Sequence, residues 1–399
     1  MQIRFSRSLI ALAAVSGLVL TGLAVSPSWA VPSYPSAAEV AAARGNVTAK
    51  KAMIARLEAV IAAQAKLADA AAKVAQIKGE AFNQAQDQVD AMTTKVNALQ
   101  SQADAASAAA NEAKQQLGQI AAQMYRDGSS GTSMNLFLNS GKAEDLLYQL
   151  GAQEKVAQQS NTIYNAAILK QNYAQSVSDE LAVAKKELAS RAAVAKSAFV
   201  EATNAAQEVQ NIVDESERKN KVAYAQLANL KDTAADLERQ RAEGLAAEAR
   251  QNAGTSMPIA PELYNVGSAN EAKVATAIAF GKEQLGERYV LGGMGPDVWD
   301  CSGLTKASYA AAGIYIGTHS ATNQFNTLAQ ARKLIPLNQA VVGDLMWYSQ
   351  ESAFNGDKYH VVIFLGGGMM MEAPNPARTV RIVPLRYGEL FPYAGRPSA

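Results

Sequence analysis

The sequence contains very little cysteine and histidine. Among its 399 residues there is one cysteine, Cys301, and there are two histidines, His319 and His360. One cysteine excludes an intramolecular disulfide. The spacing of this cysteine and the two histidines matches no zinc-binding pattern. The glycine-rich residues 292–296 lack the lysine and the helix context of a phosphate-binding loop. We therefore expect neither a metal nor another cofactor.

An excess of charge of either sign is also absent. The chain has 37 lysines and arginines against 36 aspartates and glutamates, so its overall charge does not favour a nucleic-acid partner. Hydrophobic residues make up 49% and charged residues 18% of the chain. Much of the apolar fraction is alanine, which favours long helices over one large core. The length favours two or more structural units.

The first 30 residues have the pattern of a secretory signal peptide. Arg4 and Arg7 precede an apolar stretch over residues 9–25, and small residues at Ser28 and Ala30 form a cleavage site. The alternative is an uncleaved membrane anchor, but the apolar stretch is near the lower length limit for a span. We expect cleavage after Ala30 and a location outside the cytoplasm, in the cell wall or secreted.

Residues 36–250 are predicted to form a long helical region. They contain no proline or tryptophan and few glycines. Residues at alternating spacings of three and four, which define a coiled-coil seam, are mostly apolar. They are Ile54, Leu57, Ile61, Gln64, Ala68, Ala71, Ala75, Lys78, Phe82, Ala85, Val89, Met92, Val96 and Leu99.

The helical pattern breaks once, at residues 126–133, which include two glycines among small polar residues. A second helical tract is predicted over residues 145–250, so the simplest architecture is an antiparallel hairpin. Its tip, at residues 136–147, is apolar. This tip serves either ordinary hairpin packing or the docking of a partner, and the sequence favours neither.

Residues 251–267 form a predicted linker, since they contain two glycines and two prolines and lose the helical period. Residues 268–399 then form a compact domain of ordinary size. Its first helix is expected to start with a capping box at Ser268 and Glu271. Strands are expected at residues 344–348, 360–365, 369–373 and 379–385.

Cys301 has the sequence context of a nucleophile. Asp300 is a good N-cap, which places Cys301 at the first residue of a helix predicted to end by Gly313. Unpaired backbone N–H groups and the helix dipole stabilise a thiolate at that position. A buried structural cysteine is the alternative.

A thiolate nucleophile needs a base, usually histidine. His360 begins a strand that is apolar on both faces, whereas His319 lies in a predicted loop. Glu372 is the candidate to orient His360. A three-residue loop at residues 366–368 pairs Leu365 with Met369 and puts Glu372 diagonal to His360 on one face of the sheet. A loop of two or four residues would put Glu372 on the opposite face of the sheet from His360, unless a bulge restores the pairing.

At these residues the domain resembles the NlpC-type family of cell-wall peptidases, over residues 271–397. The resemblance lies in four motifs, at residues 289–293, 300–304, 343–345 and 360–363. It implies an α+β, papain-like catalytic domain, here preceded by an all-α antiparallel coiled coil. It also implies Cys301 as nucleophile, His360 as base and Glu372 at a third position that is most often histidine in the family.

The resemblance further implies a substrate and a context. Tyr289, Asp300 and Ser302 match positions that grip the free amino end of a peptidoglycan stem peptide, and His319 is added as a substrate-binding candidate. The implied reaction is cleavage of the bond between γ-D-glutamate and the diamino acid. The helical half resembles coiled coils of hydrolases that act in daughter-cell separation. Those coils dock on a membrane complex of the FtsE–FtsX type and can hold the active site closed.

Two alternatives remain open at the sequence level. One is an amidase or acyltransferase on the same Cys–His scaffold. The other is a scaffold or activator whose terminal domain only binds wall peptides.

Overall fold

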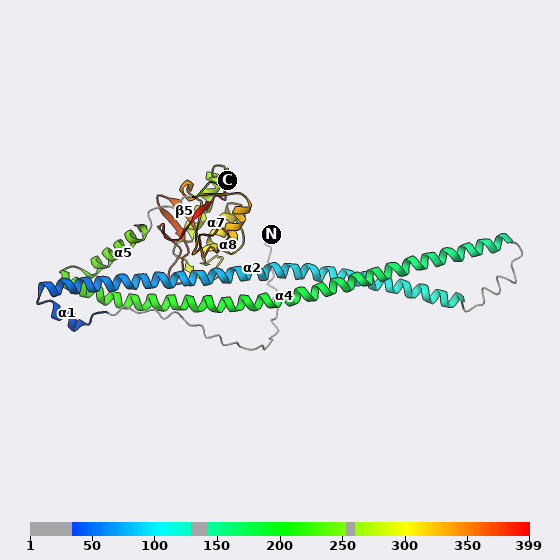
Figure 1. Ribbon diagram of the computed structural model, residues 1–399, viewed down its shortest axis with the longest axis horizontal. Coiled ribbons are helices and arrows are strands. Elements are labelled where there is room, and N and C mark those ends of the chain that lie inside the picture. The colour runs from blue at the N-terminus through cyan, green and yellow to red at the C-terminus, as the bar shows by residue number, and fades with distance from the viewer. Residues whose placement is uncertain (1–33, 129–142, 253–259) are drawn as a thin grey trace, which may run out of the picture.

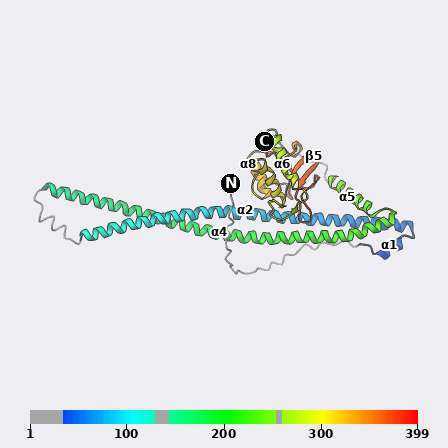
Figure 2. The same cartoon turned by 180° about the vertical axis from the view of Figure 1, so that it is seen from behind.

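The computed structural model describes residues 34–128, 143–252 and 260–399. A long helical hairpin carries a compact domain on one side (Figure 1), and the view from behind shows the same arrangement (Figure 2). The expected signal peptide and most of the apolar tip lie outside the described residues. Within the described residues, no helix combines the length and apolar character needed to cross a membrane.

The hairpin consists of two long antiparallel helices, α2 (Val47–Gly128) and α4 (Ala143–Lys231), with a short helix α1 (Ala37–Ala43) before them. None of the expected seam positions on α2 is exposed. At the base of the hairpin, Leu57 and Leu230 are fully buried in one apolar cluster. Further along, small side chains such as Ala71 and Ala75 pack against Val209 and Val213. The seam is therefore a true packing face, as its spacing predicts.

The second helical tract is not continuous, contrary to the sequence expectation. It is interrupted after Lys231, where Asp232 adopts a left-handed backbone with φ of 57°, and resumes as α5 (Ala235–Asn252). Lys231 bonds Glu238 across this turn at 2.9 Å, and Thr233 donates to the same carboxylate. The expected linker thus begins at the end of a separate helix that leads toward the compact domain (Figure 1).

The compact domain is an α+β unit built on a six-stranded antiparallel sheet. Strand order is β3-β8-β4-β5-β6-β7. The strands are β3 (Leu334–Pro336), β4 (Leu345–Tyr348), β5 (His360–Gly366), β6 (Met369–Glu372), β7 (Arg381–Pro384) and β8 (Leu390–Gly395). The remaining elements are α6 (Glu271–Glu283), β1 (Arg288–Tyr289), β2 (Val298–Trp299), α7 (Cys301–Ala311), α8 (Ala321–Gln330) and the 3-10 helix η1 (Leu337–Gln339).

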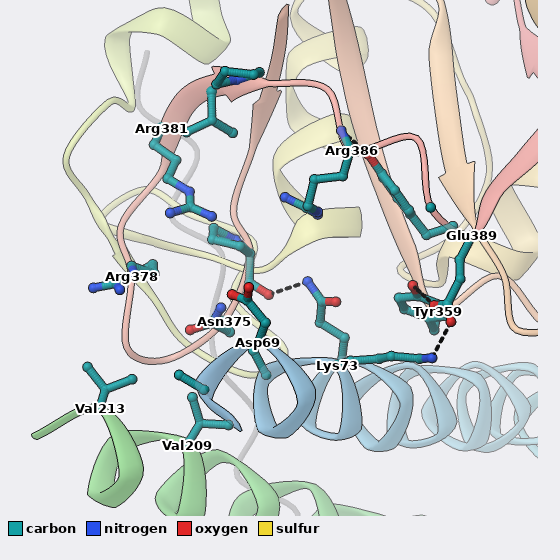
Figure 3. Close-up of a pocket in the computed structure, with 18 residues that line it drawn as sticks. Asp69, Lys73, Val209, Val213, Tyr359, Asn375, Arg378, Arg381, Arg386 and Glu389 are labelled. Carbon is teal, nitrogen blue, oxygen red and sulfur yellow. Dashed lines mark hydrogen bonds and ion pairs between the residues drawn. The ribbon is translucent and has the colours of Figure 1, made fainter. Parts of the chain in front are cut away.

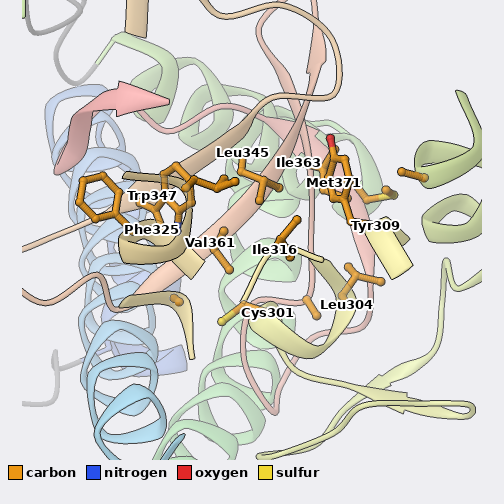
Figure 4. Packing of buried hydrophobic residues seen from close by; sticks show 14 of the residues in the cluster. Cys301, Leu304, Tyr309, Ile316, Phe325, Leu345, Trp347, Val361, Ile363 and Met371 are labelled. Atoms are coloured by element: carbon orange, nitrogen blue, oxygen red, sulfur yellow. The ribbon is translucent and has the colours of Figure 1, made fainter. Parts of the chain in front are cut away.

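Two apolar clusters form on opposite faces of this sheet. Alternate residues such as Trp347 and Val361 join one cluster, and Met346 and Val362 join the other. Figure 4 shows residues of α7 facing the sheet across the first cluster. The described members of that cluster lie between Ala260 and Tyr393, so the domain has a core of its own. This core holds α7 rigidly against β5.

The start of this domain differs in one detail from expectation. The N-cap of α6 is Asn270, whose side chain accepts from the N–H of Lys273 at 3.1 Å, and not Ser268. An asparagine closer to the apolar run caps as well as serine does, so the predicted capping box was wrong by two residues.

Candidate active site

Cys301 stands at the first residue of α7, as its sequence context predicts. Asp300 is the N-cap, and its Oδ1 accepts from the N–H of Gly303 at 2.8 Å. Glycine is required at 303 because a Cβ there would lie 2.0 Å from the carbonyl oxygen of Gly293. The close packing of these two segments fixes the start of the helix, and with it the thiol.

His360 and Glu372 form a buried pair beside this helix. His360 Nε2 lies 2.8 Å from Glu372 Oε2, and both side chains are inaccessible to solvent. Glu372 has a pKa well below its usual value: burial acts to raise it, but the charge of Arg386 and the hydrogen bond to His360 outweigh burial. An ionised Glu372 requires the hydrogen on Nε2. The other ring nitrogen, Nδ1, is buried and has no hydrogen-bond partner among the described residues.

The pairing of β5 with β6 explains how Glu372 reaches His360. Ile363 pairs with Met371 and Phe364 with Met370, which is the predicted register. The register then shifts, so that Gly366, rather than Leu365, pairs with Met369. A bulge therefore shortens the loop to Gly367 and Gly368, both with positive φ, and preserves the parity that the pair needs.

The predicted substrate-binding residues gather around Asp300. His319 Nε2 lies 2.8 Å from Asp300 Oδ1, and Ser302 Oγ donates to the same oxygen at 3.1 Å. Burial acts to raise the pKa of Asp300, but the hydrogen bond and charge of His319 and the N–H of Gly303 outweigh it, so the pKa is lowered. The ring of Tyr289 is buried nearby, and its pKa is raised well above the usual value, first by burial and then by the charge of Asp300.

Helix α2 covers this group of residues with a second, polar face. This face, which we call the plug face, comprises Gln76, Gly79, Glu80, Asn83, Gln84 and Asp87. Asn83 donates to Asp300 Oδ2 at 3.1 Å and to Ser302 Oγ at 3.4 Å. Asp87 accepts from the Thr318 hydroxyl beside His319. The hairpin thus contacts the same atoms that the sequence assigns to substrate.

Glu80 is the most deeply set residue of the plug face. Its carboxylate accepts from Ser320 Oγ at 2.6 Å and from the N–H groups of Ala321 and Thr322, at the start of α8, at 2.9 and 3.0 Å. Burial raises the pKa of Glu80 to about 7 despite these bonds. At Gly79, a Cβ would lie 3.2 Å from Leu291 Cδ1, so the helix passes close to the site.

The surroundings of Cys301, helix α2 included, act on the ionisation of its thiol. The pKa of Cys301 is raised well above its usual value, first by burial and then by the charges of Asp300 and Glu80, while hydrogen bonds to the backbone of Val361 and Ser302 act against this. The sequence predicts a thiolate here from the helix N-terminus, whereas burial and the charges of Asp300 and Glu80 act against the thiolate in this structure. A cavity of about 430 Å³ lies elsewhere, between the hairpin and the segment that contains β7 and the residues on either side of it, and Cys301 does not line it (Figure 3).

An α+β domain with a cysteine at a helix start, against a buried His–Glu pair on a strand, has the arrangement of a cysteine hydrolase. Comparison with known proteins identifies this domain: residues 286–390 match the NlpC/P60 family, so the chain carries an NlpC/P60 domain.

Several curated proteins are similar to this domain. Peptidoglycan endopeptidase RipA of Mycobacterium tuberculosis is 39% identical over 104 residues, covering 26% of this chain and 20% of that protein. Peptidoglycan endopeptidase RipB of the same species is 34% identical over 98 residues, covering 25% of this chain and 36% of that protein. The crystal structure of a P60 domain from M. avium subspecies paratuberculosis is 29% identical, covering 32% of this chain and 97% of that chain with a TM-score of 0.28. The chain thus spans only about a fifth to a third of the RipA and RipB lengths.

The sequence analysis missed two groups of residues at this site. The plug face was read only as part of a helix surface, although Glu80 and Asn83 interrupt an alanine-rich stretch. Arg381 and Arg386 both bond Glu372, and neither lies in one of the sequence motifs. A signal for them existed only in the strand register, which places Arg381 opposite Glu372.

Proposed function

We propose that this protein is a secreted peptidoglycan D,L-endopeptidase that cleaves the bond between γ-D-glutamate and diaminopimelate. Cys301 is the nucleophile, His360 the base and Glu372 the residue that orients it. The observation that carries the proposal is the buried His360–Glu372 pair. Among the described residues, His360 Nδ1 has no hydrogen-bond partner, and the next strand residue, Val361, contacts the thiol through its backbone. The names of the similar mycobacterial proteins support the substrate class.

The chemistry follows from these groups. His360 Nδ1 takes the proton of Cys301, and the sulfur attacks the amide carbonyl. Backbone N–H groups at the start of α7 stabilise the oxyanion. The imidazolium, stabilised by Glu372, then protonates the leaving amine, and the amide bond breaks to give a thioester. Water, deprotonated by His360, hydrolyses the thioester and regenerates the thiol.

Asp300 is proposed to receive the free ammonium group of the stem peptide. Its carboxylate is ionised and buried, and Tyr289, Ser302 and His319 surround it. A buried carboxylate favours a cationic partner. In this structure the Asn83 amide donates to Asp300 where that ammonium would bind.

The hairpin is proposed to hold the enzyme inactive. The plug face contacts Asp300, Ser302 and the start of α8, and Glu80 helps to keep the Cys301 thiol protonated. A stem peptide and helix α2 would need the same space. Activity therefore requires the domain to separate from α2.

Digestion of purified peptidoglycan tests both halves of this proposal. Three proteins are compared: the full chain, a fragment of residues 260–399, and that fragment with Cys301→Ala. The fragment begins at residue 260 because Ala260 and Tyr264 pack on the domain core. We expect the wild-type fragment to release L-Ala–D-Glu dipeptides, detected by mass spectrometry, and the full chain to release far less.

The alternatives predict other products. An amidase or acyltransferase on the same scaffold would leave no new amine on the diamino acid. A binding scaffold would release nothing although the fragment is folded by circular dichroism. Equal rates for the full chain and the fragment would refute inhibition by the hairpin while leaving the enzyme assignment intact.

The cellular role is proposed to be daughter-cell separation, with release of the hairpin by a membrane complex of the FtsE–FtsX type. This part rests on the resemblance of the helical half to such hydrolases. The far end of the hairpin, distant from the compact domain in Figure 1, is the part available to such a partner. Co-purification of the full chain with the complex, lost when residues 129–142 are replaced by a short glycine–serine loop, tests it.

A further inference from the structure

Two arginines also bond the carboxylate of Glu372. Arg381, on β7, donates from Nε and Nη2 to Oε1 at 3.1 and 2.8 Å. Arg386 donates from Nη1 to Oε1 and from Nη2 to Oε2, each at 2.9 Å. With His360 at 2.8 Å, the two carboxylate oxygens have five partners. A carboxylate offers about four lone-pair directions, so this one is saturated.

Both guanidinium groups are themselves held in place. The backbone N–H of Arg386 donates to the Tyr348 hydroxyl at 3.2 Å, and its guanidinium carbon lies 4.9 Å from the centre of the Tyr348 ring. Tyr348 in turn packs against the His360 ring, with centroids 5.7 Å apart. Arg381 is fixed by the pairing of β6 with β7, which places it directly opposite Glu372. Both arginines line the cavity between the sheet and the hairpin (Figure 3).

We infer that Arg381 and Arg386 are positioning residues for the reaction, because they fix Glu372 as an ionised acceptor for His360 Nε2–H and so leave Nδ1 as the atom that exchanges protons with Cys301. This inference rests on the proposed function. A histidine at this third position would be neutral or cationic, and it would not need two guanidinium groups. The arginines are thus the partners that make a glutamate suitable here.

The charges of the cluster agree with this role. Glu372 contributes one negative charge and the two arginines two positive charges, so the environment of the imidazole is net positive. The pKa of His360 is lowered, first by burial and also by the charges of Arg386 and Arg381, against the opposing effect of Glu372. On the adjacent Cys301, the charges of Asp300 and of Glu80 on α2 both act to raise the pKa of the thiol. The arginines therefore favour a neutral imidazole that can act as a base.

A purely structural role would look different. Ion pairs of Glu372 on β6 with Arg381 on β7 and with Arg386, which follows β7, would stabilise the edge of the sheet, and their loss would lower the melting temperature without changing how His360 titrates. The chain offers a matched control in Arg378, which lines the same cavity and lies 4.0 Å from Glu217 of α4. In the fragment of residues 260–399, Arg378 lacks that partner.

The test is a titration of His360 by nuclear magnetic resonance in this fragment. The chain has two histidines, so the ring signals of ¹³C,¹⁵N-histidine are few, and His319→Gln assigns them. Wild type is compared with Arg386→Gln, Arg381→Gln, Arg386→Lys and Arg378→Gln. We expect the two glutamine variants at 386 and 381 to raise the pKa of His360. Arg386→Gln should also lower the population of the Nε2–H tautomer, whereas Arg386→Lys keeps the charge and should change the pKa of His360 less than Arg386→Gln does.

Kinetics on muropeptides provide the second readout. We expect Arg386→Gln to reduce kcat by about tenfold or more with KM within about twofold of wild type, as for loss of an interaction that acts in the transition state. Arg378→Gln should match wild type. An unchanged His360 titration, or a kcat for Arg386→Gln equal to that of Arg378→Gln, overturns the inference. A wild-type fragment that cleaves nothing overturns the proposed function instead, and the titration still tests the arginines.

Discussion

Replacement of Glu80 by alanine should release the compact domain from the hairpin. Glu80 belongs to α2, far in sequence from Cys301, and its carboxylate accepts three hydrogen bonds at the start of α8. The substitution leaves Ser320 Oγ and the N–H groups of Ala321 and Thr322 buried without their acceptor. It removes no residue of the proposed catalytic machinery.

The size of the effect follows from these contacts. Each hydrogen bond contributes about 1 kcal/mol net, so the three together contribute about 3 kcal/mol to the docked state. The burial of the carboxylate, which raises its pKa to about 7, offsets part of this. A loss of about 1–3 kcal/mol corresponds to an increase of about 5- to 150-fold in the ratio of released to docked protein.

Alkylation of Cys301 measures this ratio. The thiol is buried when the helix is docked, and the chain has no other cysteine, so intact mass after iodoacetamide treatment reports the released population. We expect Glu80→Ala to react about 5- to 150-fold faster than wild type, up to the rate of the fragment of residues 260–399. Gln86→Ala is the control, since that side chain bonds Asp90 on the same helix. The reasoning is refuted if Glu80→Ala and Gln86→Ala react at the wild-type rate, or if the wild-type chain already reacts as fast as the fragment.

Three further outcomes are expected. The pKa of Glu80 is raised from 4.5 to about 7 when α2 is docked, so the docked state binds this proton more tightly and is favoured at low pH. Docking should therefore weaken as the pH rises from about 4.5 through about 7. Over that window the alkylation rate of Cys301, relative to the rate in the fragment, should rise in wild type but not in Glu80→Gln. Gly303→Ala should lower the melting temperature of the fragment, because its Cβ would lie 2.0 Å from a backbone oxygen; a stable, active variant would contradict this packing. Leu57→Ala should destabilise the base of the hairpin by about 2–5 kcal/mol in chemical denaturation followed by circular dichroism, and the transition of the compact domain, followed by tryptophan fluorescence, should not move.

The parts of the fold that repeat were predictable from the sequence. The seam on α2 follows a simple spacing of apolar residues, and burial drives those residues together whatever their partner. The start of α7 was predictable because an N-cap aspartate acts within four residues. The interruption after Lys231 was not, because Asp232 adopts a left-handed backbone without the glycine or proline that usually marks a turn.

The plug face shows why part of the site could not be predicted. Glu80 and Asn83 are polar residues on a helix, and polar helix residues usually face solvent. Their burial depends on partners more than 200 positions away in the sequence. The His360–Glu372 pair depended on a loop parity that the sequence left open, and the bulge before Gly367 decided it. The roles of Cys301, His360 and Glu372 in catalysis stay predictions.

The plug face and the seam belong to one 82-residue helix. A helix rises about 1.5 Å per residue, so Glu80 lies about 70 Å from Gly128. A rod of this length acts as a lever, and a tilt of about 5° around its far end would move Glu80 by about 6 Å, beyond the reach of a hydrogen bond. A mechanical load on the far end of the hairpin would therefore separate the plug face from the segment around Cys301 without any conformational change within the compact domain.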